Sequence, residues 1–452
     1  MILMIWTVKA CTFAYNIADG QALNAGLKLS ERESTHIFRS ERALTKVPSL
    51  LEYFSYVFFF GGVLVGPCFE AKEYFDFIDG KLIKKYDMTS TPNPIIPTLK
   101  CVVTGLLCYI GIALAAMYPI LGYMHTPAFG ALPFFPKFVY FWISITASRY
   151  KYYFAWLLGE AGCVATGFGF NGVERDPKTG KPISYAWNRV TNCNIMAVEL
   201  APHMTDVTNN WNMGVNNWLK NYVYFRVEAP TFIRKIIPQK SFINLVTKLT
   251  SAFWHGFYPS YYIFFVGAWL AGEMDDALRK SFEPAITPEQ KKARAKSWWK
   301  GPSNLYEIVS FALNMTVLNF WGICFALLRA DYTWEFIKNM HFMGFILPIA
   351  VTIICRTFFR PKKVRAIKVD GATDVNPSPS PEAKVVSVAA ISSASPNPEP
   401  PAHDNIPAKP MSTSTTFEFV DSAADTETEM VETVETSTIK SRPKRTRSNK
   451  AE

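Results

Sequence analysis

The stretch Cys101-Val-Val-Thr-Gly-Leu-Leu-Cys-Tyr-Ile-Gly-Ile-Ala-Leu-Ala-Ala-Met-Tyr-Pro-Ile-Leu-Gly-Tyr123 decides the fold class, because its 23 residues carry no charge. A helix of about 20 apolar residues is long enough to cross the hydrocarbon core of a bilayer. Residues 308–328 form a second uncharged run, and residues 340–355 form a third strong apolar run. These three runs predict an all-α polytopic membrane protein.

Weaker apolar runs suggest further membrane segments. They lie at residues 1–18, 50–69, 131–146, 152–170 and 253–271. Several of them contain Gly, Pro or a charge, which a membrane helix tolerates where its backbone is buried in protein or lines a cavity. We therefore expect about eight membrane segments together with interfacial helices. The composition agrees, because 49% of residues are hydrophobic and only 19% are charged, an unusual balance for a soluble enzyme.

The chain divides near residue 360. Basic residues at 356–365 follow the last apolar run, and the positive-inside rule then places the C-terminal tail in the cytosol. Residues 361–452 are rich in Pro, Ser, Thr and Glu, so we expect a disordered tail after a membrane-embedded domain at 1–360. The net charge of +10 indicates contact with anionic lipid rather than nucleic acid.

The cysteines indicate no metal site. The eight Cys residues are scattered, with no C-x-x-C pair and no Cys/His cluster at ligand spacing. Most lie in apolar runs, where Cys behaves as a small buried hydrophobe.

One ionisable side chain stands where an apolar segment begins. His255 lies in Ser251-Ala-Phe-Trp-His-Gly-Phe-Tyr-Pro-Ser-Tyr-Tyr262, just before the apolar residues 261–271. An ionisable group at membrane depth is costly and needs a partner or a chemical role. Histidine is the side chain best suited to accept a proton near neutral pH. The simpler alternative is an interfacial His that is hydrogen-bonded to a carbonyl.

A second stretch lies upstream, at Trp211-Asn-Met-Gly-Val-Asn-Asn-Trp-Leu-Lys-Asn-Tyr-Val-Tyr-Phe-Arg226. Its Asn212 offers both a donor and an acceptor without bringing a charge into a low dielectric. Such a carboxamide can orient a hydroxyl or stabilise an oxyanion. An Asn-rich turn taken alone is more often a helix cap or a loop.

Together the two stretches resemble the membrane-bound O-acyltransferase family, and within it the fungal-type lysophospholipid acyltransferases. The first signature is carried by Trp211, Asn212, Trp218, Leu219, Val223, Tyr224 and Arg226, and the second by Trp254, His255, Gly256, Pro259 and Tyr261. Further similar stretches are 48–53, 63–67, 152–160, 166–172 and 187–199. The resemblance covers roughly residues 1–330.

The resemblance implies a helical bundle around an intramembrane chamber, in a multi-pass protein of the endoplasmic reticulum membrane. It implies transfer of an acyl group from acyl-CoA, as co-substrate, to a lysophospholipid, with no cofactor and no metal. His255 would be the general base, and Asn212 would hold the acceptor hydroxyl or stabilise the oxyanion. Contacts with substrate would come from Trp211, Trp218, Tyr224, Arg226, Trp254, Tyr258, Tyr261 and Glu160. Because Glu160 lies inside an apolar run, we also expect it to have a polar partner or a cavity.

Two departures from the family pattern bear on this interpretation. Family members usually carry more membrane helices before the region matched by Met1, so we expect an incomplete version of the functional protein. Asn188 stands where subfamily relatives often carry Asp.

Two alternatives remain open. One is a family member with another acceptor, such as a sterol, diacylglycerol or a protein. The other is a transporter or scaffold without chemistry, although no internal repeat is visible in the sequence.

Overall fold

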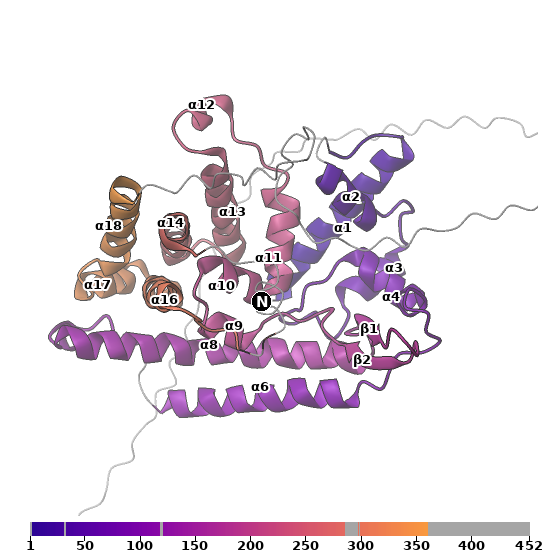
Figure 1. Cartoon of the computed structure of the whole chain (residues 1–452), viewed down its shortest axis with the longest axis horizontal. Helices are drawn as coiled ribbons and strands as arrows, with labels where there is room; N and C mark the ends of the chain where they lie inside the picture. The colour runs from indigo at the N-terminus through magenta and orange to yellow at the C-terminus, as the bar shows by residue number, and fades with distance from the viewer. Residues whose placement is uncertain (1, 31–32, 118–120, 285–296, 298, 360–452) are drawn as a thin grey trace, which may run out of the picture. The chain divides into compact units, whose positions relative to one another are not determined.

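The computed structural model describes residues 2–30, 33–117, 121–284, 297 and 299–359, and most of these residues are helical (Figure 1). The predicted tail and the predicted domain boundary at residue 360 lie outside them. The all-α fold class is confirmed by these helices. In chain order they are α1 (Ile2–Asn24), α2 (Glu33–Arg42), α3 (Leu50–Val57), α4 (Ala71–Ile78), α5 (Lys81–Lys84), α6 (Ile95–Ala116), α7 (Pro127–Gly130), α8 (Phe134–Ala165), α9 (Ile195–Glu199), α10 (Met204–Asn210), α11 (Met213–Leu219), α12 (Thr231–Arg234), α13 (Gln239–His255), α14 (Pro259–Phe282), α16 (Leu305–Leu327), α17 (Ala330–Asn339) and α18 (Met343–Phe358).

Two smaller elements complete the described fold. A π-helix, η1 (Lys220–Tyr224), continues directly from α11. Strands β1 (Gly172–Arg175) and β2 (Pro182–Ala186) pair antiparallel as a hairpin. The hairpin loop is closed by Asp176, whose carboxylate accepts hydrogen bonds from the backbone N–H groups of Lys178 and Thr179.

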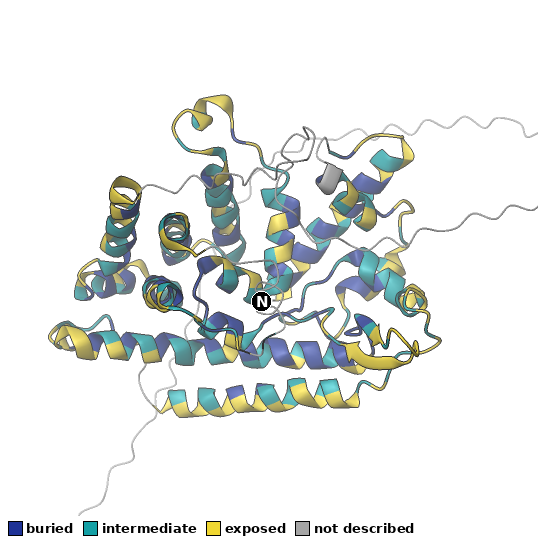
Figure 2. Ribbon diagram, in the orientation of Figure 1, coloured by how far each residue is buried: buried dark blue, intermediate teal, exposed yellow. Residues whose placement is uncertain are grey.

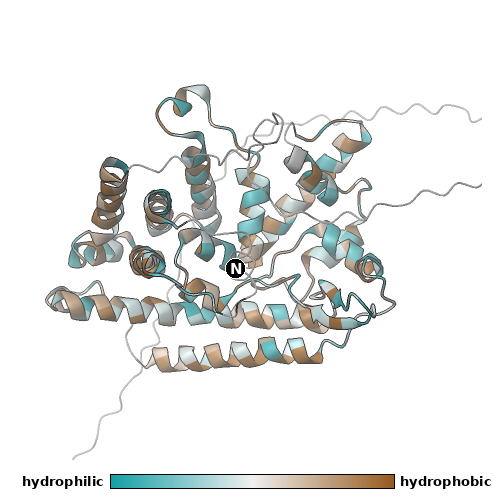
Figure 3. Cartoon of the chain, in the orientation of Figure 1, coloured by the Kyte–Doolittle hydropathy of each residue, from teal (hydrophilic) through white to brown (hydrophobic). Residues whose placement is uncertain are grey.

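The strongest predicted span forms α6, which lies alongside the long helix α8 (Figure 1). Only 11% of its most apolar 18-residue window is buried, and its outward face is exposed and apolar (Figures 2 and 3). A helix with an unburied apolar surface of this length suits contact with lipid chains. α6 and α16 are each long and apolar enough to cross a membrane, and α17 with α18, bent by 60°, provides a third span if the pair is counted together.

The weaker predicted spans differ from the helices that form. The runs 131–146 and 152–170 merge into the 32-residue helix α8. The helix continues through Arg149, which lies between the two runs, because the buried guanidinium pairs with Glu199. The run 50–69 is α-helical only through α3, which ends at Val57. Among the described residues, two or three helices therefore meet the criteria for a membrane span, where we had expected about eight segments.

Helix α1 is tied to α3 by a buried cation. The ammonium group of Lys9, which is fully buried, donates to the carbonyl oxygens of Tyr56 at 2.8 Å and Val57 at 3.1 Å. Both carbonyls belong to the last turn of α3, where a cation satisfies free acceptors and the helix dipole. The same ammonium lies 4.5 Å from the ring centroid of Phe69. Lys9 therefore has partners that explain a charge within an apolar helix.

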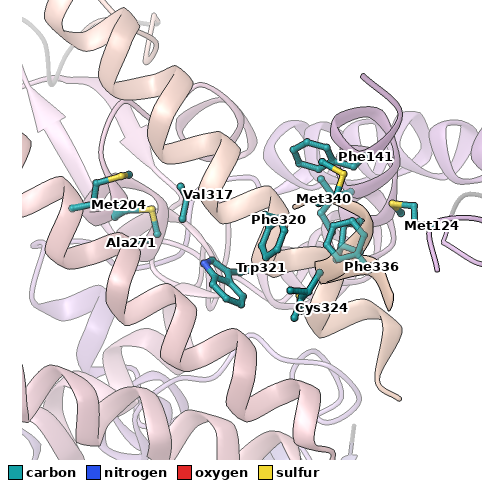
Figure 4. Packing of buried hydrophobic residues seen from close by; sticks show 14 of the residues in the cluster. Met124, Phe141, Met204, Ala271, Val317, Phe320, Trp321, Cys324, Phe336 and Met340 are labelled. Atoms are coloured by element: carbon teal, nitrogen blue, oxygen red, sulfur yellow. The ribbon is translucent and has the colours of Figure 1, made fainter. Parts of the chain in front are cut away.

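The largest apolar core joins α14, α16, α17 and α18 (Figure 4). Trp321 and Phe320 of α16 are fully buried at its centre. Two glycines allow this close packing. A Cβ atom on Gly267 of α14 would lie 2.1 Å from Trp321, and one on Gly344 of α18 would lie 2.1 Å from Phe320.

We predict that Gly267→Val lowers the stability of the protein. The new side chain would overlap the Trp321 indole, and overpacking of this kind costs about 1–3 kcal/mol or more. Thermal unfolding of the purified protein in detergent measures the effect. The matched control is Gly272→Val on the same helix, where a Cβ atom meets nothing within 4 Å. Equal melting temperatures for the two variants would contradict the assigned packing.

Candidate active site

His255 is the last residue of α13, at a break between two helices. The helix ends because Gly256 adopts φ 124°, a conformation that favours glycine. α14 then begins at Pro259, whose fixed φ suits the first turn of a helix. The predicted apolar run 253–271 is therefore two helices, with the imidazole at their junction.

Aromatic rings surround the His255 imidazole. The ring centroids of Trp254, Tyr261, Phe265 and Phe325 lie 4.8, 5.4, 5.5 and 5.0 Å from that of His255. In the part of the chain that has described coordinates, neither ring nitrogen makes a hydrogen bond to protein. The imidazole is half-buried, so an apolar shell leaves its nitrogens available to a bound molecule.

Asn212 lies at the start of α11 with a left-handed backbone, φ 45° and ψ 54°. Asparagine tolerates this region better than most residues. The residue occupies the N-cap position, yet its side chain makes no capping hydrogen bond. The side-chain oxygen Oδ1 instead accepts a hydrogen bond from Nδ2 of Asn192 at 3.2 Å. The side chain therefore does not serve as an ordinary helix cap.

Packed aromatic side chains connect the elements that carry these two residues. The rings of Trp218 in α11 and Trp254 in α13 lie 6.2 Å apart. On the other side, Trp211 packs edge-on against Trp156 of α8 at 4.9 Å. Within the described coordinates, no hydrogen bond joins the Asn212 side chain directly to His255. The packed rings thus join α11 to α13, and a substrate would have to bridge the Asn212 carboxamide and the His255 imidazole.

Two predicted substrate-contact residues already have protein partners. Arg226 donates from Nη2 to the carboxylate of Asp19 at 2.8 Å, and its guanidinium lies 4.3 Å from the ring centroid of Tyr15. The indole Nε1 of Trp254 donates to the carbonyl of Met4 at 2.9 Å. These contacts attach the motif residues to helix α1.

The other predicted contact residues lie in different parts of the fold. Tyr261 lies beside the imidazole, and Tyr258, which is 55% exposed, lies 5.9 Å from Tyr261. Trp218 is buried in a cluster with Val8, and Tyr224 is half-buried in η1. Trp211 packs against the α8 rings of Tyr152, Tyr153 and Trp156.

Glu160 has the polar partner that we expected. One carboxylate oxygen accepts from the Thr191 hydroxyl at 2.6 Å, and the other accepts from the backbone N–H of Asn192 at 3.4 Å. The side chain is buried within α8. Glu160 therefore supports the segment that contacts Asn212 and makes no hydrogen bond to Asn212 itself.

Sequence reasoning assigned no role to three residues of the site. Asn192 is completely buried and holds Asn212, while Phe265 and Phe325 form part of the ring shell around the imidazole. Asn192 belongs to the 187–199 stretch that resembles the family, which is the signal that would have drawn attention to it. Phe325 lies 70 residues from His255 in the chain, so no local pattern connects them.

The described residues contain no group of three or more His, Cys, Asp or Glu side chains that would hold a metal ion. The arrangement offers a base and a carboxamide in apolar surroundings. It suits proton transfer and hydrogen bonding to a carbonyl or hydroxyl.

Residues 1–298 match the family model of the membrane-bound O-acyltransferases. The chain belongs to this family. As a member it is an integral membrane acyltransferase, in agreement with its apolar helices.

The chain is also similar to curated relatives from plants, fungi and animals. It is 29% identical to lysophospholipid acyltransferase 2 of Arabidopsis thaliana over 355 residues, 78% of this chain and 70% of the relative. It is 31% identical to the lysophospholipid acyltransferase of Schizosaccharomyces pombe over 371 residues, 79% of this chain and 66% of the relative. Human membrane-bound glycerophospholipid O-acyltransferase 1 is 28% identical over 386 residues, 80% of this chain and 68% of the relative.

We predict that Arg226→Gln lowers the melting temperature and leaves KM for acyl-CoA unchanged. The variant loses a partly buried hydrogen bond between charged groups, of a kind worth about 1.5–3 kcal/mol. Thermal unfolding and initial rates at varied acyl-CoA would be measured together. Arg329→Gln, whose ion pair with Asp331 is exposed, is the control. A KM raised several-fold at an unchanged melting temperature would instead assign Arg226 to substrate.

Proposed function

We propose that this chain is an acyl-CoA-dependent lysophospholipid O-acyltransferase of the endoplasmic reticulum membrane. The observation that carries the proposal is the imidazole of His255 at the junction of α13 and α14, which makes no protein hydrogen bond among the described residues, with Asn212 on the neighbouring element. The names of the relatives support lysophospholipids as acceptors. The family match makes a transporter or scaffold without chemistry the weaker interpretation.

The reaction would proceed by direct attack on the thioester. The imidazole of His255 accepts the proton of the lysophospholipid hydroxyl as the hydroxyl oxygen bonds to the thioester carbonyl carbon. The carbonyl oxygen then carries negative charge, to which the Asn212 carboxamide can donate. When the C–S bond breaks, the imidazolium returns its proton to the CoA sulfur. The products are a phospholipid ester and CoA with a free thiol.

The apolar rings around His255 would exclude water from this step. Exclusion matters because water is a competing nucleophile that would hydrolyse the thioester. The remaining rate enhancement would come from holding the hydroxyl and the thioester in contact.

The acceptor is tested by supplying microsomes that contain this protein with labelled oleoyl-CoA and a panel of acceptors. We expect product from lysophospholipids and none above background from cholesterol, diacylglycerol or peptide. Product from one of the latter acceptors alone would establish the family activity and overturn the lysophospholipid assignment.

We predict that His255→Ala lowers the initial rate with lysophosphatidylcholine and oleoyl-CoA by about 10²–10⁴, the usual contribution of general acid–base catalysis. Protein abundance in the membrane should stay near the wild-type level, because the imidazole makes no protein hydrogen bond in the described residues. His125→Ala is the matched control, since the His125 ring stacks on Tyr332 and is not one of the rings that contact the His255 imidazole. A His255→Ala rate above about one tenth of wild type would remove His255 as the base.

We predict that Asn212→Ala lowers kcat more than it raises KM for acyl-CoA. A group that donates to developing charge acts mainly in the transition state, and its loss typically costs about 10²–10³ in rate. Steady-state kinetics at varied acyl-CoA separate the two constants. The reverse pattern, an increased KM with kcat intact, would assign Asn212 to ground-state binding.

A further inference from the structure

We infer that Asn192 is a positioning residue that fixes which end of the Asn212 carboxamide faces the substrate. Asn212 then acts as a hydrogen-bond donor to the thioester carbonyl oxygen and does not accept from the acceptor hydroxyl. This inference rests on the proposed function and chooses between the two roles that the sequence left open for Asn212.

The inference starts from a backbone group whose role is unambiguous. The N–H of Gly214 points at the Asn192 side chain, with 3.1 Å between the nitrogen and Oδ1. A backbone N–H only donates, so the Asn192 atom that faces it must be the carbonyl oxygen. The ambiguity between O and N that affects most Asn side chains is therefore resolved at residue 192 by its hydrogen bonds.

The orientation of the Asn192 side chain determines the orientation of the Asn212 side chain. Since Oδ1 of Asn192 faces Gly214, its amide nitrogen Nδ2 faces Asn212 and must donate. The Asn212 atom that receives this bond, at 3.2 Å, is then its oxygen Oδ1. The Asn212 amide group, Nδ2, is left without a hydrogen-bond acceptor among the described residues. The free end of the Asn212 side chain is thus a donor.

Asn192 is held rigidly enough to impose this orientation. Its side chain has no exposed surface. Its backbone carbonyl accepts from the N–H of Met213 at 2.8 Å, and its own N–H donates to Glu160. Glu160 is in turn fixed by the Thr191 hydroxyl at 2.6 Å. Asn192 therefore makes three hydrogen bonds to the segment 212–214, and its backbone N–H is also bonded to Glu160 of α8.

The backbone of the segment cannot easily shift either. A Cβ atom on Gly214 would lie 2.5 Å from the carbonyl oxygen of Cys68, so this turn is pressed against the 68–70 loop. The αL conformation of Asn212 adds a further local constraint. A preorganised donor needs little rearrangement as charge develops on the thioester oxygen, which is the condition for oxyanion stabilisation.

The test is Asn192→Asp, a change that keeps size and shape. One oxygen of the introduced carboxylate still accepts from Gly214, but the other can no longer donate while the group is ionised. Asn212 would then turn its Nδ2 toward the carboxylate, and the donor would be lost to the substrate. We expect kcat to fall by about 10²–10³, as for an oxyanion donor, with KM for lysophospholipid within about two-fold.

The pH dependence separates this role from a structural one. Asn192 has no exposed surface and lies next to the Glu160 carboxylate, and both features would raise the pKa of an introduced carboxyl group above the usual Asp range of about 4. Once protonated, this group can donate to Asn212 again, so the rate of the variant relative to wild type should rise as the pH falls from about 8.5 to about 6. A purely structural defect predicts a constant ratio together with a lower melting temperature. A ratio near one at about pH 8.5 would overturn the inference.

Two further variants complete the experiment. In the Asn212→Ala background, Asn192→Asp should slow the reaction no further, because both act through the same amide. Additive losses would show that Asn192 acts elsewhere. Asn194→Asp is the matched control, since its Oδ1 only accepts from the N–H of Ala197 and Asp can do the same. A wild-type enzyme without lysophospholipid activity would refute the proposed function, whereas an active wild type with an equally active Asn192→Asp refutes only this inference.

Discussion

The hydrogen bond from the Gly214 N–H to the Asn192 side chain is the contact on which the candidate site depends. In a largely apolar protein, a buried polar group that lacks a partner costs more than its hydrogen bond would contribute. Each donor around Asn192 accordingly faces an acceptor. The Gly214 N–H donates to Oδ1 of Asn192, and Nδ2 of Asn192 donates to Oδ1 of Asn212. The Gly214 N–H therefore fixes the direction of both hydrogen bonds, and Nδ2 of Asn212 has no acceptor in the described part of the chain.

The same constraint organises the helices around the site. Arg149 in the middle of α8 is buried, and it donates to both oxygens of Glu199 and to Oδ1 of Asn319. Asp275 of α14 accepts from Asn314 of α16 and lies 3.2 Å from Nδ1 of His203. Each network joins a long helix to the 195–203 segment, which precedes α10 and Asn212. Polar side chains within apolar helices therefore attach the segment between β2 and α11 to the surrounding bundle.

The sequence was sufficient for the fold class, because uncharged runs are local patterns, and its paired motifs singled out His255 and Asn212 as candidates. It was less informative about helix boundaries. The charges at Arg149 and Lys151 suggested two helices in place of α8, because the partner of Arg149 lies 50 residues away at Glu199. Likewise, Arg226 looked available for contact with substrate, and only the folded chain brings Asp19 to it. The role of Asn192 depends on hydrogen-bond direction, which no residue pattern encodes.

Both central side chains stand where regular helix is interrupted, and this placement has a physical basis. His255 precedes Gly256 at the end of α13, and Asn212 has a left-handed backbone at the start of α11. Within a membrane, irregular backbone is tolerated only where protein or a water-filled cavity surrounds it. The rings of Trp254, Tyr261 and Phe325 supply such protein surroundings at the α13–α14 junction. At the α11 turn, Asn192 satisfies the N–H groups of Met213 and Gly214 that the helix leaves open. Because Asn192 satisfies these N–H groups, the Asn212 side chain is not needed for capping, and its Nδ2 has no acceptor among the described residues.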